Sequence, residues 1–429
     1  MENQVEEPKV FEEGGYKFTV LNDDPKTVNK VRERIKKSQE YNEINFSNLK
    51  ELTGITIPEG VSIINQWAFE NCENLTQIKI PNSVASIGRE AFYGCKNLTQ
   101  ITIPNSVQSI GESAFENCEN LTQTNIPENV TSIGERTFFR CKNLTQITIP
   151  NSVINIGKEA FCACKNLQKI TIPNNVTSIE ESAFAGCENL TQINLPENEI
   201  SIGRHVFYNC KNLTQINLPE KLTSISDSVF SSCENLAEIN IPKNVTSIGD
   251  YAFSNCENLT QINIPENVTS IGERAFYGCE NLTQINIPEN VTSIGERAFY
   301  GCENLTQINI PENVTSIGKS AFENCENLTQ INIPEKVTSI GESAFKGCYK
   351  LKKVKISTPL FLSIGVENIY EKLGLDSDVK ISVYKNELNS DRKGVFDKIN
   401  DEKSSAGVFD KINDEKNEKE KPPQTKEPR

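Results

Sequence analysis

The chain has 429 residues and a formal net charge of −14, and a field of that sign would repel nucleic acids and anionic membrane surfaces. Hydrophobic residues make up 36% of the chain and charged residues 24%, which is typical of folded domains. The single histidine leaves almost no room for chemistry that depends on imidazole groups.

Residues 1–15 are expected to form a flexible N-terminus. The first residues are acidic and contain no apolar segment of the kind that directs secretion, so the sequence predicts no secretory signal peptide. No apolar run approaches the roughly 20 residues that a membrane-spanning helix needs. We therefore expect no membrane insertion.

Residues 16–51 predict a small cap made of a strand and a helix. The strand runs from Tyr16 to Leu21, and the helix starts at Asp24-Pro25, since aspartate suits the N-cap and proline suits the first turn. One face of this helix is apolar, through Val28, Val31 and Ile35. We expect the cap to cover the end of the repeated region that follows, and adhesion through the helix is the alternative.

Residues 52–357 repeat with a period of 23 residues. Of 14 cysteines, 13 keep this interval from Cys72 to Cys348, and only Cys162 lies outside the series. Leucines, prolines and phenylalanines keep the same interval without insertion or deletion. The sequence therefore predicts 13 units and a partial unit, each forming one coil of an elongated repeat domain.

The unit is clearest at residues 258–280, which are repeated letter for letter at 281–303. Apolar and polar residues alternate over residues 259–264, as in a short strand with one buried face, and Pro265 ends the pairing. Gly272 permits a turn, and residues 273–276 predict a single helical or 3₁₀ turn. The side chains expected to point inward are Leu259, Ile262, Ile264, Val268, Ile271, Ala275, Phe276 and Cys279. One coil cannot bury them alone, so successive coils must stack, with a parallel sheet and continuous apolar columns.

The pattern Leu-x-x-Ile-x-Ile-Pro-x-x-Val-x-x-Ile-Gly-x-x-Ala-Phe-x-x-Cys, from Leu282 to Cys302, resembles the BspA-like, or Treponema-type, class of leucine-rich repeats. The resemblance covers roughly residues 52–357. It implies a β-rich solenoid, a right-handed superhelix with a parallel sheet on one face. It also implies a surface or secreted protein of a bacterium or parasitic protist that binds matrix or host-cell proteins.

Residues 358–390 predict a second cap, with a helix from Val366 to Leu373 and a last strand from Val379 to Tyr384. Residues 391–429 are rich in lysine and glutamate and poor in apolar residues, so they predict a disordered tail. Within the tail, the sequence GVFDKINDEK at 394–403 recurs at 407–416. Partner docking through this duplicated segment is the alternative.

The sequence predicts no catalytic residues, no metal site and no cofactor. A 23-residue cysteine interval does not fit a zinc site, so we interpret the cysteines as buried thiols that fill the core. An unpaired series of this kind fits a reducing compartment better than an oxidising one.

The candidate binding residues are exposed amides on the repeated strand: Gln261, Asn263, Gln284, Asn286, Gln307, Asn309, Gln330 and Asn332. Nearly identical coils offer one weak contact many times, which suits extended or multivalent recognition. The alternative is that these amides only solvate the sheet and bond along their own ladder.

We therefore expect a non-enzymatic adhesion or protein-binding solenoid. Its partner would be a protein, such as a host or matrix protein, or a glycan, and not a small-molecule substrate. The alternative function is an intracellular scaffold or effector whose tail docks one partner while the array holds another. The missing signal and the free thiols favour a cytoplasmic protein, whereas the family resemblance implies the cell surface or secretion. An enzyme in the flanking segments and a purely structural spacer are the remaining alternatives.

Overall fold

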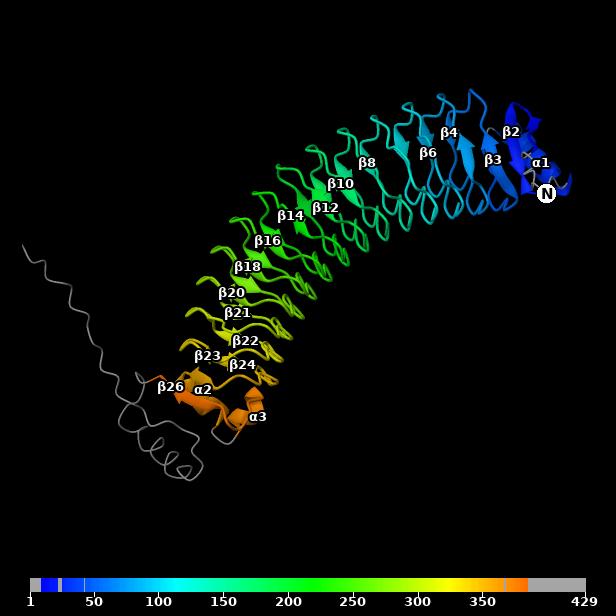
Figure 1. Ribbon diagram of the computed structural model, residues 1–429. Coiled ribbons are helices and arrows are strands. Elements are labelled where there is room, and N and C mark those ends of the chain that lie inside the picture. The colour runs from blue at the N-terminus through cyan, green and yellow to red at the C-terminus, as the bar shows by residue number, and fades with distance from the viewer. Residues whose placement is uncertain (1–8, 22–24, 42, 366–367, 385–429) are drawn as a thin grey trace, which may run out of the picture.

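The computed structural model describes residues 9–21, 25–41, 43–365 and 368–384. These residues form a curved rod of stacked coils with a small α/β cap at each end (Figure 1). Equivalent strands of successive coils pair in parallel, which confirms the predicted β-rich solenoid. The buried side chains form one continuous core from Tyr16 in the first cap to Ile381 in the second.

Each coil contributes short strands at two places. The first series is β3 (Leu52–Thr56), β5 (Gln77–Lys79), β10 (Lys169–Thr171), β12 (Gln192–Asn194), β14 (Gln215–Ile216), β16 (Glu238–Asn240), β18 (Gln261–Asn263), β20 (Gln284–Asn286), β23 (Gln330–Asn332) and β25 (Lys353–Ile356). In the coils between them, single bridges such as Asn286 with Asn309 continue the pairing. The strands before β25 are short because a proline such as Pro265 follows each of them and has no N–H to donate.

The second series consists of two-residue strands, most of them Ser-Ile. Its members are β4 (Ile63–Ile64), β6 (Ser86–Ile87), β7 (Ser109–Ile110), β8 (Ser132–Ile133), β9 (Asn155–Ile156), β11 (Ser178–Ile179), β13 (Ser201–Ile202), β15 (Ser224–Ile225), β17 (Ser247–Ile248), β19 (Ser270–Ile271), β21 (Ser293–Ile294), β22 (Ser316–Ile317) and β24 (Ser339–Ile340). The isoleucine of each strand is buried, while the residue before it is exposed or half-buried. Pairing within this series keeps the isoleucines stacked, as Ile271 with Ile294 shows.

The third side of each coil is a run of turns that is hydrogen-bonded to the next coil. The main-chain N–H of Arg274 donates to Glu296 O at 2.8 Å. The N–H of Phe276 donates to Ala298 O, also at 2.8 Å. Arg274 has a φ of 51°. The segment therefore differs from the expected helical or 3₁₀ turn, because alternate N–H groups point at the neighbouring coil.

Columns of identical side chains fill the interior. Phenylalanine rings stack from Phe46 to Phe345, with centroid distances between 5.2 Å and 6.1 Å. The widest spacing, 6.1 Å, lies between Phe184 and Phe207, and the spacing from Phe207 to Phe230, 5.7 Å, is also wider than most. There Val206 and Val229 stand where most coils have the smaller alanine, so the extra methyl groups separate the coils locally.

The N-terminal cap consists of β1 (Phe11–Glu13), β2 (Tyr16–Val20) and α1 (Pro25–Tyr41). Strand β2 pairs antiparallel with β1 and with β3, so it covers the edge of the first coil's sheet. The face of α1 that carries Val28, Val31 and Ile35 is buried in the core, as its apolar spacing predicts.

The expectation of a flexible segment at residues 1–15 is wrong for residues 11–13, which form β1. Gly14 and Gly15 have positive φ values of 51° and 84° and turn the chain back on itself. The Phe11 ring then stacks on Phe18 with a centroid distance of 5.6 Å. Residues 1–8 lie outside the described residues.

The C-terminal cap contains α2 (Thr358–Ile364), α3 (Ile369–Leu373) and β26 (Lys380–Val383). The sequence analysis missed α2, although Ser357 caps it and proline occupies its first turn. The predicted helix from Val366 is described only as α3, because residues 366–367 lie outside the described residues. The predicted last strand is present as β26, which pairs in parallel with β25. The predicted tail, 391–429, also lies outside the described residues.

Candidate functional site

The eight candidate amides lie together on the first strand series, on the side of the sheet that faces away from the core. In β18 and β20, Gln261 pairs with Gln284 and Asn263 with Asn286, while the isoleucine between the two amides is buried. The amides of the following coils continue this surface through the bridge of Asn286 with Asn309 and through β23. We call this surface the amide ladder.

The amide ladder lines a shallow hollow of about 520 Å³ that spans four coils. The lining consists of the eight amide residues and the isoleucines between them: Ile262, Ile285, Ile308 and Ile331. All eight amide residues are exposed. The structure therefore brings every predicted binding residue into one continuous surface.

The hollow continues toward the N-terminus beyond the predicted residues. A second hollow of about 490 Å³ is lined by side chains that include Gln215, Asn217, Glu238 and Asn240. The sequence analysis missed these positions because Glu238 interrupts the run of identical residues. Their place in the 23-residue period is the signal that would have found them.

The amide side chains of the ladder make no hydrogen bond with one another within the described residues. A different asparagine column shows the contrast, because its members do bond to one another. Asn189 Nδ2 donates to Asn166 Oδ1 at 3.0 Å, and Asn212 donates to Asn189 in the same way. The asparagine of each Asn-Leu turn is therefore used to hold the coils together, whereas the amides of the ladder remain available.

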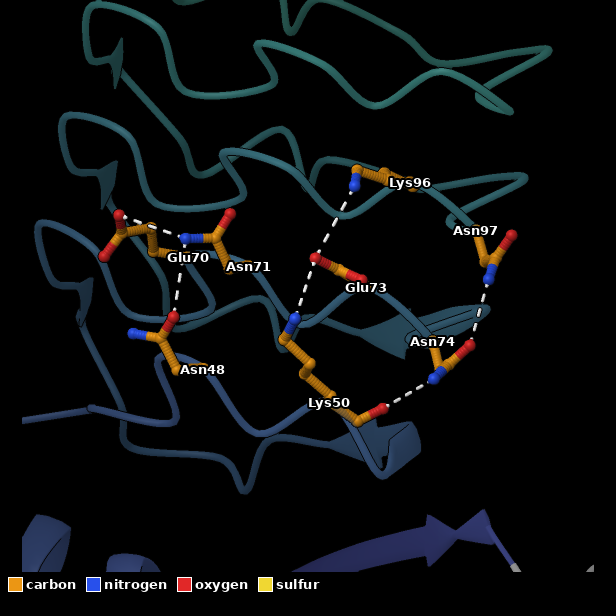
Figure 2. A network of polar contacts seen from close by, with 8 residues as sticks. All are labelled: Asn48, Lys50, Glu70, Asn71, Glu73, Asn74, Lys96 and Asn97. Carbon is orange, nitrogen blue, oxygen red and sulfur yellow. Dashed lines mark hydrogen bonds and ion pairs between the residues drawn. The ribbon is translucent and has the colours of Figure 1, made fainter.

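The turn side carrying this asparagine column also carries charged pairs between coils. In Figure 2, Glu73 accepts from Lys50 at 3.2 Å and approaches Lys96 at 3.5 Å, beside the bond from Asn97 to Asn74. The position of Glu73 and Lys96 is occupied by glutamate in every coil from Glu234 to Glu326. Burial raises the pKa of Glu303, and the neighbouring Glu280 and Glu326 raise it further.

The 13 cysteines of the repeat form a buried column of free thiols. Cys279 Sγ, for example, donates to Phe253 O at 3.2 Å, and burial raises the pKa of this thiol to about 12. A protonated, buried thiol reacts slowly with oxidants. Burial therefore protects the column in an oxidising as well as in a reducing compartment, and the free thiols do not specify the location of the protein.

No group of three or more histidine, cysteine, aspartate or glutamate side chains among the described residues is arranged to hold a metal ion. None of their helices has the length and hydropathy needed to span a membrane. His205, the single histidine, packs its ring against Tyr208 at 6.0 Å.

The comparisons with known proteins agree with the repeat geometry. The sequence pattern of the family described as BspA type leucine rich repeat region (6 copies) matches residues 39–168, 133–260 and 246–375. A leucine-rich repeat protein from Bacteroides ovatus is 31% identical, over 78% of this chain and 95% of that chain, with a TM-score of 0.51. A leucine rich cell surface protein from Faecalibacterium prausnitzii is 28% identical, over 86% of this chain and 99% of that chain, with a TM-score of 0.50. No match is found among curated protein sequences. The chain belongs to the BspA-type leucine-rich-repeat family.

Proposed function

We propose that the protein is a non-enzymatic interaction solenoid that binds an extended segment of a partner protein along the amide ladder. The observation that carries this proposal is the contrast between two polar columns. The asparagines of the turns bond to one another, whereas the exposed amides of the ladder have no such bonds within the described residues.

The energetics of the ladder favour a long partner over a small ligand. One amide hydrogen bond contributes only about 1 kcal/mol, so a single coil binds weakly. Equivalent amides repeat from coil to coil in register, so a partner that crosses four coils can add several such contacts. The hollow is shallow and open, unlike the deep apolar pocket that a small molecule usually needs.

The repeated coils also argue against catalysis at this surface. A catalytic site requires differently tuned groups in a unique arrangement, and the ladder presents the same two amides in each coil. Solenoids of this family typically act without enzymatic activity. The relative from Faecalibacterium prausnitzii is described as a cell surface protein, which supports adhesion to an extracellular protein as the role of the ladder.

The test places charge in the middle of the ladder. We expect Gln284→Lys with Gln307→Lys to fold normally, because Lys169 occupies the same position of the repeat in β10. The unmodified protein and the variant would each be immobilised and tested for the surface-exposed proteins that they capture. The affinity of each captured partner would then be measured by calorimetry. We expect the variant to bind its partner at least about tenfold more weakly.

The matched control is Glu280→Gln with Glu303→Gln on the turn side, which changes the net charge by the same amount. This control should bind as the unmodified protein does. Equal affinities for the unmodified protein and the lysine variant would show that the ladder is not the binding surface.

A further inference from the structure

A third hollow lies on the turn side of the coils, away from the amide ladder. It is formed along the column of residues that directly follow the stacked phenylalanines: Tyr208, Ser231, Ser254, Tyr277 and Tyr300. Main-chain bonds hold this column in register, since Asn209 N donates to Ser231 O at 2.8 Å and Asn255 N donates to Tyr277 O at 2.6 Å. Each residue of the column is therefore one coil from the next.

Two serines interrupt a column of tyrosine rings. The rings of Tyr277 and Tyr300 stack on adjacent coils with a centroid distance of 4.8 Å. Between Tyr208 and Tyr277 two coils carry serine instead, so two rings are missing. The two serine coils lie in a hollow of about 690 Å³ that runs from Tyr208 past Tyr277 to Tyr300 and Glu323.

The hollow has aromatic ends and a hydroxyl floor. Tyr208, which is 43% exposed, lies at one end, and Tyr277 and Tyr300 lie toward the other. Ser231 and Ser254 are buried at the floor, and their hydroxyls make no side-chain hydrogen bond within the described residues. Tyr251 lies beside the floor, where the Arg274 guanidinium stacks over its ring at 5.1 Å.

The charges around the hollow are already paired. Arg274 bonds to Glu273 at 2.5 Å and Arg297 to Glu296 at 2.8 Å. Glu323, the acidic residue of the lining, pairs with Lys346 at 3.3 Å. The site therefore has no free charge with which to select an anion or a cation.

A peptide strand has no means of docking here. The alternate main-chain N–H groups of this side already donate to the next coil, as Ser232 N does to Ser254 O at 2.7 Å. No sheet edge is left for strand addition, and the floor is polar and not apolar. A ligand of this hollow must instead combine an apolar face for the tyrosines with hydroxyl groups for the serines.

We propose that this hollow binds a short neutral oligosaccharide. A pyranose ring has an apolar C–H face that stacks on tyrosine and a rim of hydroxyl groups that exchange hydrogen bonds with serine hydroxyls. The two missing rings leave room along the solenoid axis for consecutive sugar units. This site is independent of the amide ladder, because it lies on a different side of the coil and uses different residues.

The test replaces the two serines with tyrosine, the residue that the neighbouring coils have at this position. The chain itself has tyrosine at this position in four coils, as Tyr93, Tyr208, Tyr277 and Tyr300. Ser231→Tyr with Ser254→Tyr should therefore complete the column without disturbing the fold. Full-length protein would be titrated by calorimetry and by saturation-transfer NMR with neutral hexasaccharides of glucose, mannose, galactose and N-acetylglucosamine, each up to about 10 mM.

We expect at least one hexasaccharide to bind the unmodified protein and to lose at least about tenfold in affinity in the double tyrosine variant. Ala185→Tyr is the matched control, because it adds a tyrosine to the same column on the far side of Tyr208 and should leave binding unchanged. Tyr277→Ala removes one aromatic end and should weaken binding as well. The proposal is overturned if no hexasaccharide binds, or if the double tyrosine variant binds as the unmodified protein does.

Discussion

Among single residues, the buried cysteines pack as small apolar side chains, and their thiols become charged only if they lose a proton. Burial raises the pKa of every thiol of the repeat, to about 12 for Cys72 and Cys279 and further for several others. The neighbouring thiols add to this shift at Cys256 and Cys302. A thiolate inside the column would have no counter-charge, so the folded protein holds these protons tightly.

This retention of protons predicts a steep loss of stability at alkaline pH. The unfolded chain releases its thiol protons near the ordinary pKa of 9.0, while the folded chain keeps them. Stability is therefore complete below about pH 9 and falls as the pH rises toward the folded pKa, by about 1.4 kcal/mol per pH unit for each thiol. Urea unfolding of reduced protein between pH 8 and pH 11 measures this slope.

Tyrosine and lysine titrate in the same range, so a variant must isolate the thiols. Replacing Cys256, Cys279 and Cys302 with alanine should reduce the slope by about 4 kcal/mol per pH unit. An unchanged slope would mean that the buried thiols do not govern the alkaline transition.

Within each coil, the glycine that follows the Ser-Ile strand, such as Gly341, lets adjacent coils approach closely. A Cβ added at Gly341 would overlap the main-chain nitrogen of Lys319 in the preceding coil, and Gly111 and Gly318 have similar neighbours. At Gly134 the nearest atom to an added Cβ is Thr137 Oγ1 at 3.4 Å, which is an ordinary contact. One position of the repeat therefore has different tolerances in different coils.

This difference predicts opposite outcomes for the same substitution. Gly341→Ala should destabilise the protein by about 1–3 kcal/mol, because the coils must separate to make room. Gly134→Ala should stay within about 1 kcal/mol of the unmodified protein, since the methyl group fits and the unfolded chain loses freedom. Thermal and urea unfolding of the two variants tests the pair, and equal effects would contradict the close approach at Gly341.

The sequence predicts the buried face of each coil but not the structure of its turn side. The apolar period predicted the buried face of the coil, because positions such as Ile262 and Phe276 are the same in most units and must stack. The sequence predicts a single helical or 3₁₀ turn at residues 273–276, because these residues favour it locally. Bonding to the next coil overrides that preference, and no local pattern shows it. The turn asparagines bond to one another and the amides of the ladder do not. This difference depends on the directions of the side chains, which cannot be read from the sequence.

In the whole molecule, each coil contacts only its neighbours, so the stability of the solenoid is approximately the sum of contributions from coils and from the interfaces between them. The stacked rings of Phe276 and Phe299 are 5.3 Å apart, and the coils that contain them have identical sequences. Removing one of these coils therefore joins surfaces that already fit each other.

We expect deletion of residues 281–303 to give a folded particle about 5 Å shorter. Small-angle scattering measures the length, and thermal unfolding measures the fold. Deletion of residues 281–291 is the control, because it removes half a coil and puts the strands out of register. A full-coil deletion that aggregates like the half-coil deletion would contradict independent stacking.

The turn asparagines carry a consequence for producing the protein. Ten of them stand in Asn-Leu-Thr, the acceptor sequence for N-linked glycosylation, which attaches sugar to the same Nδ2 atom that bridges neighbouring turns. An enzyme that modifies the nascent chain would reach these atoms before the coils close over them, and a modified asparagine could no longer donate to its neighbour. Expression in a eukaryotic secretory host would therefore yield chains that cannot assemble, whereas bacterial expression avoids the modification.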